Sequence, residues 1–362
     1  MEEKAFWVAF NQTPGLGIRR VLRLIEFFGT AKAAWYANES ELLKVKGLGK
    51  TLVTSLIYWR RKKEPERIIE ELNHKGIKVV TLIDKEYPIE LKRIYDPPPV
   101  IYWRGKQLPN KGLKIAIVGT RRATPYGLKV AETLSADLVA AGVGIVSGLA
   151  RGIDAAAHKG VIKQGGMTWG VLGCGVDVVY PPEHKNLYHQ VMERGAILSE
   201  YPPGTRPEAR NFPARNRIIS GLTAGIVVVE SAKRSGALIT ADLALEQNRD
   251  VFAVPGPITS RCSEGPNNLI KQGAKVVTQV EDILEEYNLK PVLKDDSKDK
   301  NEADNLTTNE EKVLAGLSLV PTHIDAIISM TGLSPGELNN ILIQLEIRQL
   351  IRRMPGGFYI RC

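Results

Sequence analysis

Short apolar runs alternate with helical stretches through the middle of the chain. Continuous runs rich in valine, isoleucine and glycine predict strands at 114–119, 144–147, 168–172, 196–199, 225–230 and 250–254. The intervals between these runs have the length and composition of helices. Buried strands that alternate with helices are typical of a parallel sheet covered on both faces. We therefore predict an α/β fold for residues 76–287.

The regions on either side of this segment have different patterns. Residues 1–75 contain short helical stretches with few β-branched runs. Residues 288–304 are polar and charged without periodicity, which predicts a solvated linker. Residues 305–362 predict a winged helix, with helices at 309–317, 322–328 and 335–349 and a final strand pair that turns at 355–357.

The charge of the C-terminal unit does not favour duplex DNA as its partner. The unit has five basic and five acidic residues, and its helix at 335–349 is mostly apolar or acidic. Contact with a protein is therefore at least as well supported as reading of a DNA groove.

A short pattern occurs twice in the first region. The sequence PGLG at 14–17 and the sequence KGLG at 46–49 each precede a helical stretch. A Gly-apolar-Gly turn between short helices is typical of a helix-hairpin-helix, in which glycine lets a helix N-terminus approach a phosphate. Arg19, Arg20 and Lys50 follow these turns. Packing alone, DNA contact and protein docking all remain open as roles for the pattern.

Length and charge set limits on the class of protein. The 362 residues suggest two or three folded units, and the net charge of +9 favours an anionic partner such as nucleic acid, nucleotides or an acidic membrane surface. Three scattered cysteines do not form a disulfide scaffold or a zinc motif. The N-terminal sequence is not a signal peptide, and no apolar run approaches the ~20 residues of a membrane span. We expect a soluble cytoplasmic protein without metal or cofactor.

Four loops with basic residues are predicted at one edge of the sheet, because the carboxyl ends of parallel strands share an edge where turn amides and helix N-termini face outward. Arginine provides a planar cationic fork for phosphate, and a phenylalanine ring provides a face for a base. The loops contain the candidate anion-binding residues Gly119, Thr120, Arg121, Ser147, Gly148, Arg151, Asn211, Phe212, Arg215, Asn216, Arg217, Lys233, Arg234, Ser235 and Gly236.

Motifs for catalysis are weak in this sequence. It contains no GxxxxGK[ST] loop, and the glycines after the first predicted strand do not form GxGxxG. Asp154 and His158 share one helix face near Ser147, as parts of a hydrolytic triad could. A helix cap and a local hydrogen bond explain Asp154 and His158 better. The pattern favours binding over turnover, and we assign no catalytic residue.

Five motifs in order resemble the DNA-processing protein A family (DprA, also called Smf). They are VGTRRATPYG, VSGLARGIDAAAH, NFPARNRIISGL, KRSGALITADLALEQNRDVFAVPG and GPNNLIKQGA, within residues 80–287. The resemblance implies an extended Rossmann-like core, doubly wound around a mostly parallel sheet. It also implies an N-terminal domain of the SAM or helix-hairpin-helix type and a C-terminal winged helix. The four cationic loops would then form the DNA-binding pocket.

The resemblance also implies a function. Members of this family bind single-stranded DNA, protect incoming strands and load the RecA recombinase during natural transformation. They form homodimers and are not known as enzymes. The resemblance places self-association at Asn268, Leu269 and Ile270.

Two other functions stay open. Related Rossmann-like proteins hydrolyse nucleotides or nucleoside phosphates, although this chain lacks their PGGxGT-type loop. A transcription factor that uses its winged helix is the second alternative.

Overall fold

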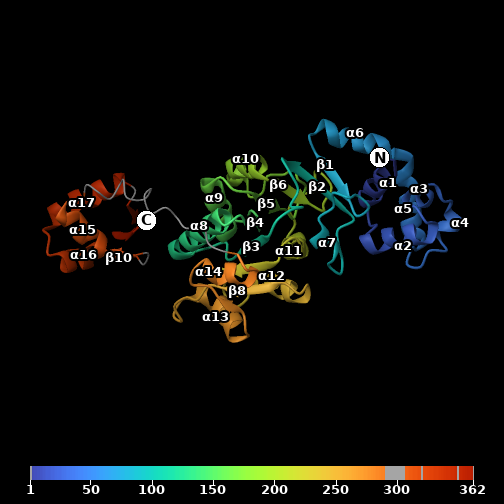
Figure 1. Cartoon of the computed structure of the whole chain (residues 1–362). Coiled ribbons are helices and arrows are strands. Elements are labelled where there is room, and N and C mark those ends of the chain that lie inside the picture. The colour runs from blue at the N-terminus through green and yellow to red at the C-terminus, as the bar shows by residue number, and fades with distance from the viewer. Residues whose placement is uncertain (1, 290–305, 319–320, 349, 362) are drawn as a thin grey trace. The chain divides into compact units, whose positions relative to one another are not determined.

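The computed structural model describes residues 2–289, 306–318, 321–348 and 350–361 (Figure 1). By their contacts these residues form two compact units, one of 2–123 with 130–289 and one of 306–361 with 124–129. The linker predicted at 288–304 lies outside the described residues except for its first two positions.

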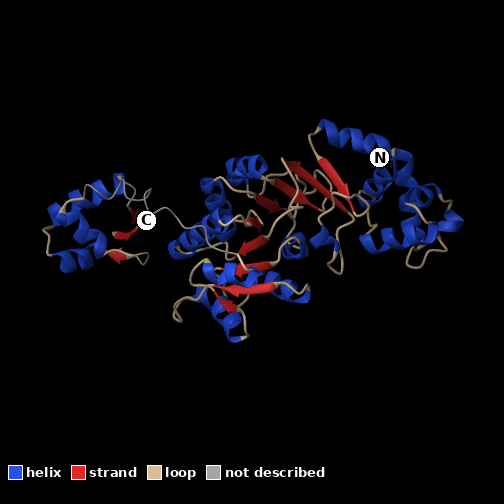
Figure 2. Ribbon diagram, viewed as in Figure 1, coloured by secondary structure: helices blue, strands red, loops and turns tan. Residues whose placement is uncertain are grey.

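A nine-stranded sheet forms the centre of the first unit (Figure 2). Its strands are β1 (Lys78–Thr81), β2 (Val100–Gly105), β3 (Lys114–Val118), β4 (Gly144–Ser147), β5 (Thr168–Val171), β6 (Ala196–Ser199), β7 (Gly225–Val228), β8 (Asp250–Ala253) and β9 (Lys275–Val276). The order across the sheet is β1-β2-β6-β5-β4-β3-β7-β8-β9. The last seven strands in this order are parallel, and β1 and β2 pair antiparallel at one edge. The predicted strands are confirmed, and four of them end one or two residues earlier than expected.

The chain connections make β3 a topological switch point, at which the strand order reverses. From β3 the chain proceeds through β4 and β5 to β6 on one side, then crosses to β7 on the other side of β3. The loops that follow β3 and β7 therefore lead to helices on opposite faces. Such a position leaves a crevice beyond the carboxyl ends of the strands, where ligands bind in open α/β sheets.

Helices cover both faces of the sheet, so the doubly wound prediction is confirmed. They are α7 (Ile89–Lys92), α8 (Pro125–Ala140), α9 (Ile153–Gln164), α10 (Lys185–Arg194), α11 (Asn211–Gly221), α12 (Gly236–Glu246), α13 (Glu264–Lys271) and α14 (Glu281–Leu284), with 3-10 turns at Pro182–His184, Arg261–Ser263 and Glu285–Tyr287. Alternate residues of one strand enter different apolar cores. Ile197 packs in the core with α9 and α10, and Leu198 packs in the core with α11 and α12.

The N-terminal helices pack directly onto the sheet. They are α1 (Glu2–Asn11), α2 (Ile18–Phe28), α3 (Ala31–Tyr36), α4 (Glu39–Leu42), α5 (Lys50–Lys62) and α6 (Pro65–His74). Phe10 and Trp35 share an apolar core with Val100 and Tyr102 of β2, and the Tyr102 hydroxyl donates a hydrogen bond to Asn11 Oδ1 at 2.7 Å. This core is continuous across position 75, so the domain boundary there stays a prediction.

The C-terminal unit is a winged helix, as predicted. It contains α15 (Thr308–Ala315), β10 (Thr322–His323), α16 (Ile324–Thr331), α17 (Pro335–Ile347), β11 (Ile351–Met354) and β12 (Phe358–Arg361), with strand order β10-β12-β11. The helix predicted from position 322 begins two residues later, because Thr322 and His323 pair with β12 as a strand. None of the helices in the described part of the chain has the length and apolar character that a bilayer span requires.

Candidate nucleic-acid interface

A cleft of about 590 Å³ lies beyond the carboxyl end of β3, at the topological switch point of the sheet. A smaller hollow adjoins it, because Arg121, Ala150, Tyr180 and Phe212 line both. We call the two together the switch-point cleft. Its lining includes the following candidate or newly found residues: Gly119, Thr120, Arg121, Arg122, Gly148, Arg151, Asp154, Tyr180, Phe212, Arg215, Asn216, Ser235 and Gly236.

Two glycines allow three loops to meet at this cleft. The Thr120 amide donates a hydrogen bond to the Glu230 carbonyl at 2.7 Å, and the Ile153 amide donates to the Thr120 carbonyl at 3.3 Å. A Cβ atom on Gly119 would lie 2.8 Å from the Glu230 carbonyl oxygen, and one on Gly152 would lie 2.3 Å from that of Thr120. Gly152 also has a φ of 75°, which side chains disfavour. The loop that presents Arg121 is therefore fixed from both sides.

Arg121 is exposed and available to a ligand. Among the described residues its guanidinium has no ion-pair or hydrogen-bond partner, and its central carbon lies 5.3 Å from the centre of the Phe212 ring. The Tyr180 ring lies 5.5 Å from Phe212 on the same wall of the cleft. A cation beside two aromatic rings suits a ligand that has both a phosphate and a planar base.

The N-terminus of α12 forms another part of the lining. Ser235 caps this helix by accepting a hydrogen bond from the Ala237 amide at 3.2 Å. No atom lies within 4 Å of the position that a Cβ on Gly236 would take, so the helix end is open to the cleft. Lys233 and Arg234 are exposed in the turn just before it. The partial positive charge of the helix end and these two cations favour an anion.

Arg215 belongs to the lining of the cleft, but its guanidinium is engaged with the backbone. Its side chain is only 4% exposed, and Nη1 donates hydrogen bonds to the carbonyl oxygen of Gly148, at 2.9 Å, and to that of Val171. Burial lowers the pKa of Arg215 to about 10, an effect that the nearby Asp154 carboxylate opposes. Burial likewise raises the pKa of Asp154, and the charge of Arg215 opposes this. The two charges support each other below the loop at Gly148.

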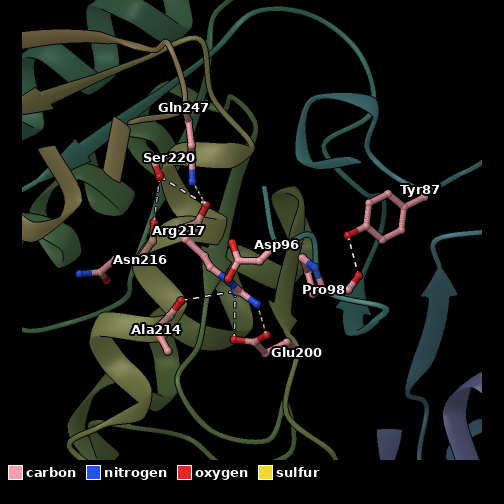
Figure 3. A network of polar contacts seen from close by, with 9 residues as sticks. All are labelled: Tyr87, Asp96, Pro98, Glu200, Ala214, Asn216, Arg217, Ser220 and Gln247. Carbon is pink, nitrogen blue, oxygen red and sulfur yellow. Dashed lines mark hydrogen bonds and ion pairs between the residues drawn. The ribbon is translucent and has the colours of Figure 1, made fainter. Parts of the chain in front are cut away.

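Arg217 is not brought into the cleft. Its Nε lies 2.9 Å from Asp96 Oδ2, and its Nη1 lies 3.1 Å from Glu200 Oε1 (Figure 3). Its carbonyl oxygen accepts a hydrogen bond from Gln247 Nε2 at 3.1 Å. The guanidinium thus joins three segments of the fold, and a direct contact of Arg217 with a ligand stays only a prediction.

The other predicted residues take different places around the cleft. Arg151 reaches the smaller hollow, where its exposed guanidinium pairs with Glu183 and thereby lowers the pKa of that carboxyl. The Arg151–Glu183 ion pair is exposed and contributes little to stability, so Arg151 could exchange Glu183 for a phosphate at low cost.

The two predicted asparagines belong to α11. Asn216 donates from Nδ2 to the Gly236 carbonyl oxygen at 3.2 Å, and Asn211 is buried at the start of the helix.

The three residues considered as a triad have partners elsewhere. The Ser147 hydroxyl donates to the Ile117 carbonyl at 2.6 Å, and His158 Nδ1 contacts Thr168 Oγ1 at 2.7 Å. Burial lowers the pKa of His158 to about 3, so the ring is neutral. These polar groups hold strands and helices together.

The predicted self-association residues lie on α13. Leu269 is buried in the core against β8, whereas Asn268 and Ile270 are half-buried. Only the latter two could contribute to a contact with another chain, and that role stays a prediction.

The lining also includes residues outside the predicted set, among them Arg122, Tyr180, Pro207 and Ala209. Tyr180 belongs to the loop after β5, which ends at the same edge as the other cationic loops. The rule of strand ends that predicted the other loops would have found this loop as well.

Comparisons with known proteins agree with this architecture. The family model for DNA recombination-mediator protein A matches residues 78–288, and the DprA winged helix domain matches residues 297–357. Protein Smf from Synechocystis sp. is 36% identical over 99% of each chain. DNA processing protein DprA from Bacillus subtilis is 46% identical over 61% of this chain and 74% of its own.

Two solved structures are also similar. DprA from Streptococcus pneumoniae superposes with a TM-score of 0.70 at 34% identity, covering 78% of this chain and 97% of its own. DNA processing protein A from Helicobacter pylori, studied for its mode of binding single-stranded DNA, gives a TM-score of 0.54 at 28% identity. That match covers 59% of this chain and 95% of the other.

Proposed function

The chain belongs to the DNA recombination-mediator protein A family, also called DprA or Smf, and we propose that it binds single-stranded DNA in the switch-point cleft. The proposal rests on one observation. The Arg121 guanidinium, which has no ion-pair or hydrogen-bond partner among the described residues, lines the same cleft as the open N-terminus of α12. Arg122 is exposed in the lining of the same cleft, and Lys233 and Arg234 are exposed in the turn that precedes α12. Together these groups match the regular negative charges of a phosphate chain.

The cleft favours a single strand for a mechanical reason. Its anion-binding groups lie inside a crevice between loops, so a phosphate reaches them only if the backbone bends into it. A flexible single strand bends at low cost, whereas a duplex is stiff over many base pairs. Phe212 and Tyr180 would contact bases through their ring faces, which every base can stack on. We therefore expect little dependence on sequence.

The family membership supports further roles, which we include in the proposal. The bound strand would be protected and then transferred to the RecA recombinase during natural transformation or recombination. A second copy of the chain would join through the Rossmann-like domain near Asn268 and Ile270. The protein would act by binding, without turnover, because Ser147 and His158 are engaged inside the fold.

Competition between oligonucleotides tests the proposal. Fluorescence anisotropy with labelled oligothymidylate should show displacement by unlabelled single strands and little displacement by duplex of equal length. The logarithm of the binding constant should fall with the logarithm of salt concentration, with a slope of about 0.7 per phosphate contacted. Preferential displacement by duplex would contradict the proposal and favour a role as transcription factor. Release of base or phosphate from nucleoside monophosphates, above a buffer control, would favour the hydrolase alternative.

A further inference from the structure

The two Gly-apolar-Gly turns of the N-terminal region lie side by side. Arg20 joins them, because its Nε donates to the Gly47 carbonyl oxygen at 3.1 Å and its Nη1 donates to that of Gly15 at 3.3 Å. Gly17 and Gly49 occupy the N-cap positions of α2 and α5, and the space beside both is open. Both helices therefore start at one surface of the first unit.

This surface is strongly cationic. Arg19, Arg23, Lys46 and Lys50 are exposed there, and among the described residues none of them has an acidic partner. Arg23 is held near the second turn by a hydrogen bond from Nη1 to the Lys46 carbonyl oxygen at 3.2 Å. A depression of about 410 Å³ opens along Gly17 and the first turns of α2.

An aromatic ring stands on the same surface. The Tyr95 side chain is 90% exposed, and the guanidinium carbon of Arg19 lies 5.8 Å from its ring centre. Burial of a tyrosine ring is normally favourable, so such an exposed ring beside a cation suits a partner that is planar and anionic. A nucleotide of a single strand has both properties.

The position of Tyr95 connects this surface with the switch-point cleft. Tyr95 precedes Asp96, which pairs with Arg217 of α11, and α7 packs against α11 (Figure 1). Phe212 of the cleft lies five residues before Arg217 in α11, which is about 8 Å along a helix. Arg217 also offsets one of the two negative charges of Asp96 and Glu200, which reduces the repulsion of a phosphate chain on this route.

We propose that a single strand leaving the switch-point cleft continues over Tyr95 onto the cationic turns of α2 and α5. Tyr95 stacks on a base, and Arg19, Lys46 and Lys50 contact phosphates. This inference rests on the proposed binding of single-stranded DNA. It adds a second contact that only a longer strand can reach, and it gives the paired turns a function beyond packing.

The test compares two lengths of oligothymidylate by fluorescence anisotropy, about 6 nucleotides to fill the cleft and about 25 to reach beyond it. Tyr95→Ala should weaken binding of the long strand about fivefold or more and change the short one less than twofold, because loss of base stacking costs this much. Arg19→Ala should act in the same direction. Tyr58→Ala is the matched control, because Tyr58 is also an exposed tyrosine with a cation, Lys62, 4.3 Å from its ring centre. It should leave both affinities unchanged.

Other outcomes distinguish this inference from the proposal on which it rests. The inference is overturned if Tyr95→Ala and Arg19→Ala bind the long strand as tightly as the wild type does and still bind the short one. The cleft would then remain the DNA site. Equal losses for both lengths also overturn it, because the variants would then act on the cleft. Failure of the wild type to bind either strand refutes the proposed function itself.

Discussion

Arg215 donates a hydrogen bond from Nη1 to the carbonyl oxygen of Gly148 at 2.9 Å, in the cleft that Arg215 and Arg121 both line. The two arginines thus have different environments although both belong to the same site. Arg215 is buried and engaged with the backbone. Arg121 is exposed, and its guanidinium lies over the face of the Phe212 ring. One arginine builds the cleft, and the other is free to bind a ligand.

Arg215→Ala should therefore act mainly on stability. Removal of the guanidinium leaves the carbonyl of Gly148 without its donor and the buried Asp154 carboxyl without a nearby positive charge. We expect the free energy of unfolding to fall by about 3 kcal/mol, measured by urea denaturation at neutral pH. Adding Asp154→Asn should cost less in the Arg215→Ala background than in the wild type. A variant as stable as the wild type would contradict the supporting role of Arg215.

Gly236→Asp should separate stability from binding. The open space at Gly236 accepts a side chain, and an acidic residue at a helix N-terminus is favourable, so the free energy of unfolding should rise by about 1 kcal/mol. The same carboxylate lies in the proposed phosphate site and should weaken binding of single-stranded DNA at least tenfold. Gly236→Ala, the neutral control, should gain similar stability and keep most of the affinity. Normal DNA binding by Gly236→Asp would place the phosphates elsewhere.

His158 should make the protein sensitive to acid. The unfolded imidazole gains a proton below its ordinary pKa of 6.5, whereas burial lowers the pKa in the folded protein to about 3. Acid therefore favours the unfolded state, and the stability contributed by the neutral ring is complete above pH 6.5 and lost progressively between pH 6.5 and 3. The loss amounts to about 1.4 kcal/mol per pH unit.

His158→Gln isolates this contribution. The raised pKa of Asp154 acts in the opposite direction, because the folded protein takes up that proton first, but it is present in both proteins. The variant should start from a lower stability at pH 7.5 and lose less of it between pH 6 and 4, as measured by urea denaturation. Parallel curves for the two proteins would show that His158 is not the acid-sensitive group.

The pattern of the sequence predicted the fold and the edge at which the cleft lies. Apolar runs located every parallel strand from β3 to β8, and the rule that strand ends share an edge brought Arg121, Arg151 and the start of α12 together. The exception in the winged helix was Thr322-His323, where pairing with β12 prevailed over a helical pattern.

The roles of individual arginines could not be predicted, because they depend on contacts between distant segments. Arg217 pairs with Asp96, which is 121 positions away in the sequence. Arg215 is covered by the loops at Gly148 and Val171, and nothing in its local sequence distinguishes it from Arg121. An arginine beside a phosphate and an arginine beside a carbonyl look the same until the fold brings their partners together.

Binding of labelled oligothymidylate to Arg121→Ala and Lys111→Ala, compared by fluorescence anisotropy at one salt concentration, examines the DNA site itself. Both variants lose one exposed positive charge, but Lys111 lies before β3, at the opposite edge of the sheet from Arg121. Arg121→Ala should weaken binding about tenfold, because a charged hydrogen bond to phosphate is lost, and should leave the melting temperature unchanged. Lys111→Ala should bind as the wild type does. Equal affinities for the two variants would contradict the assignment of the switch-point cleft as the site of single-stranded DNA.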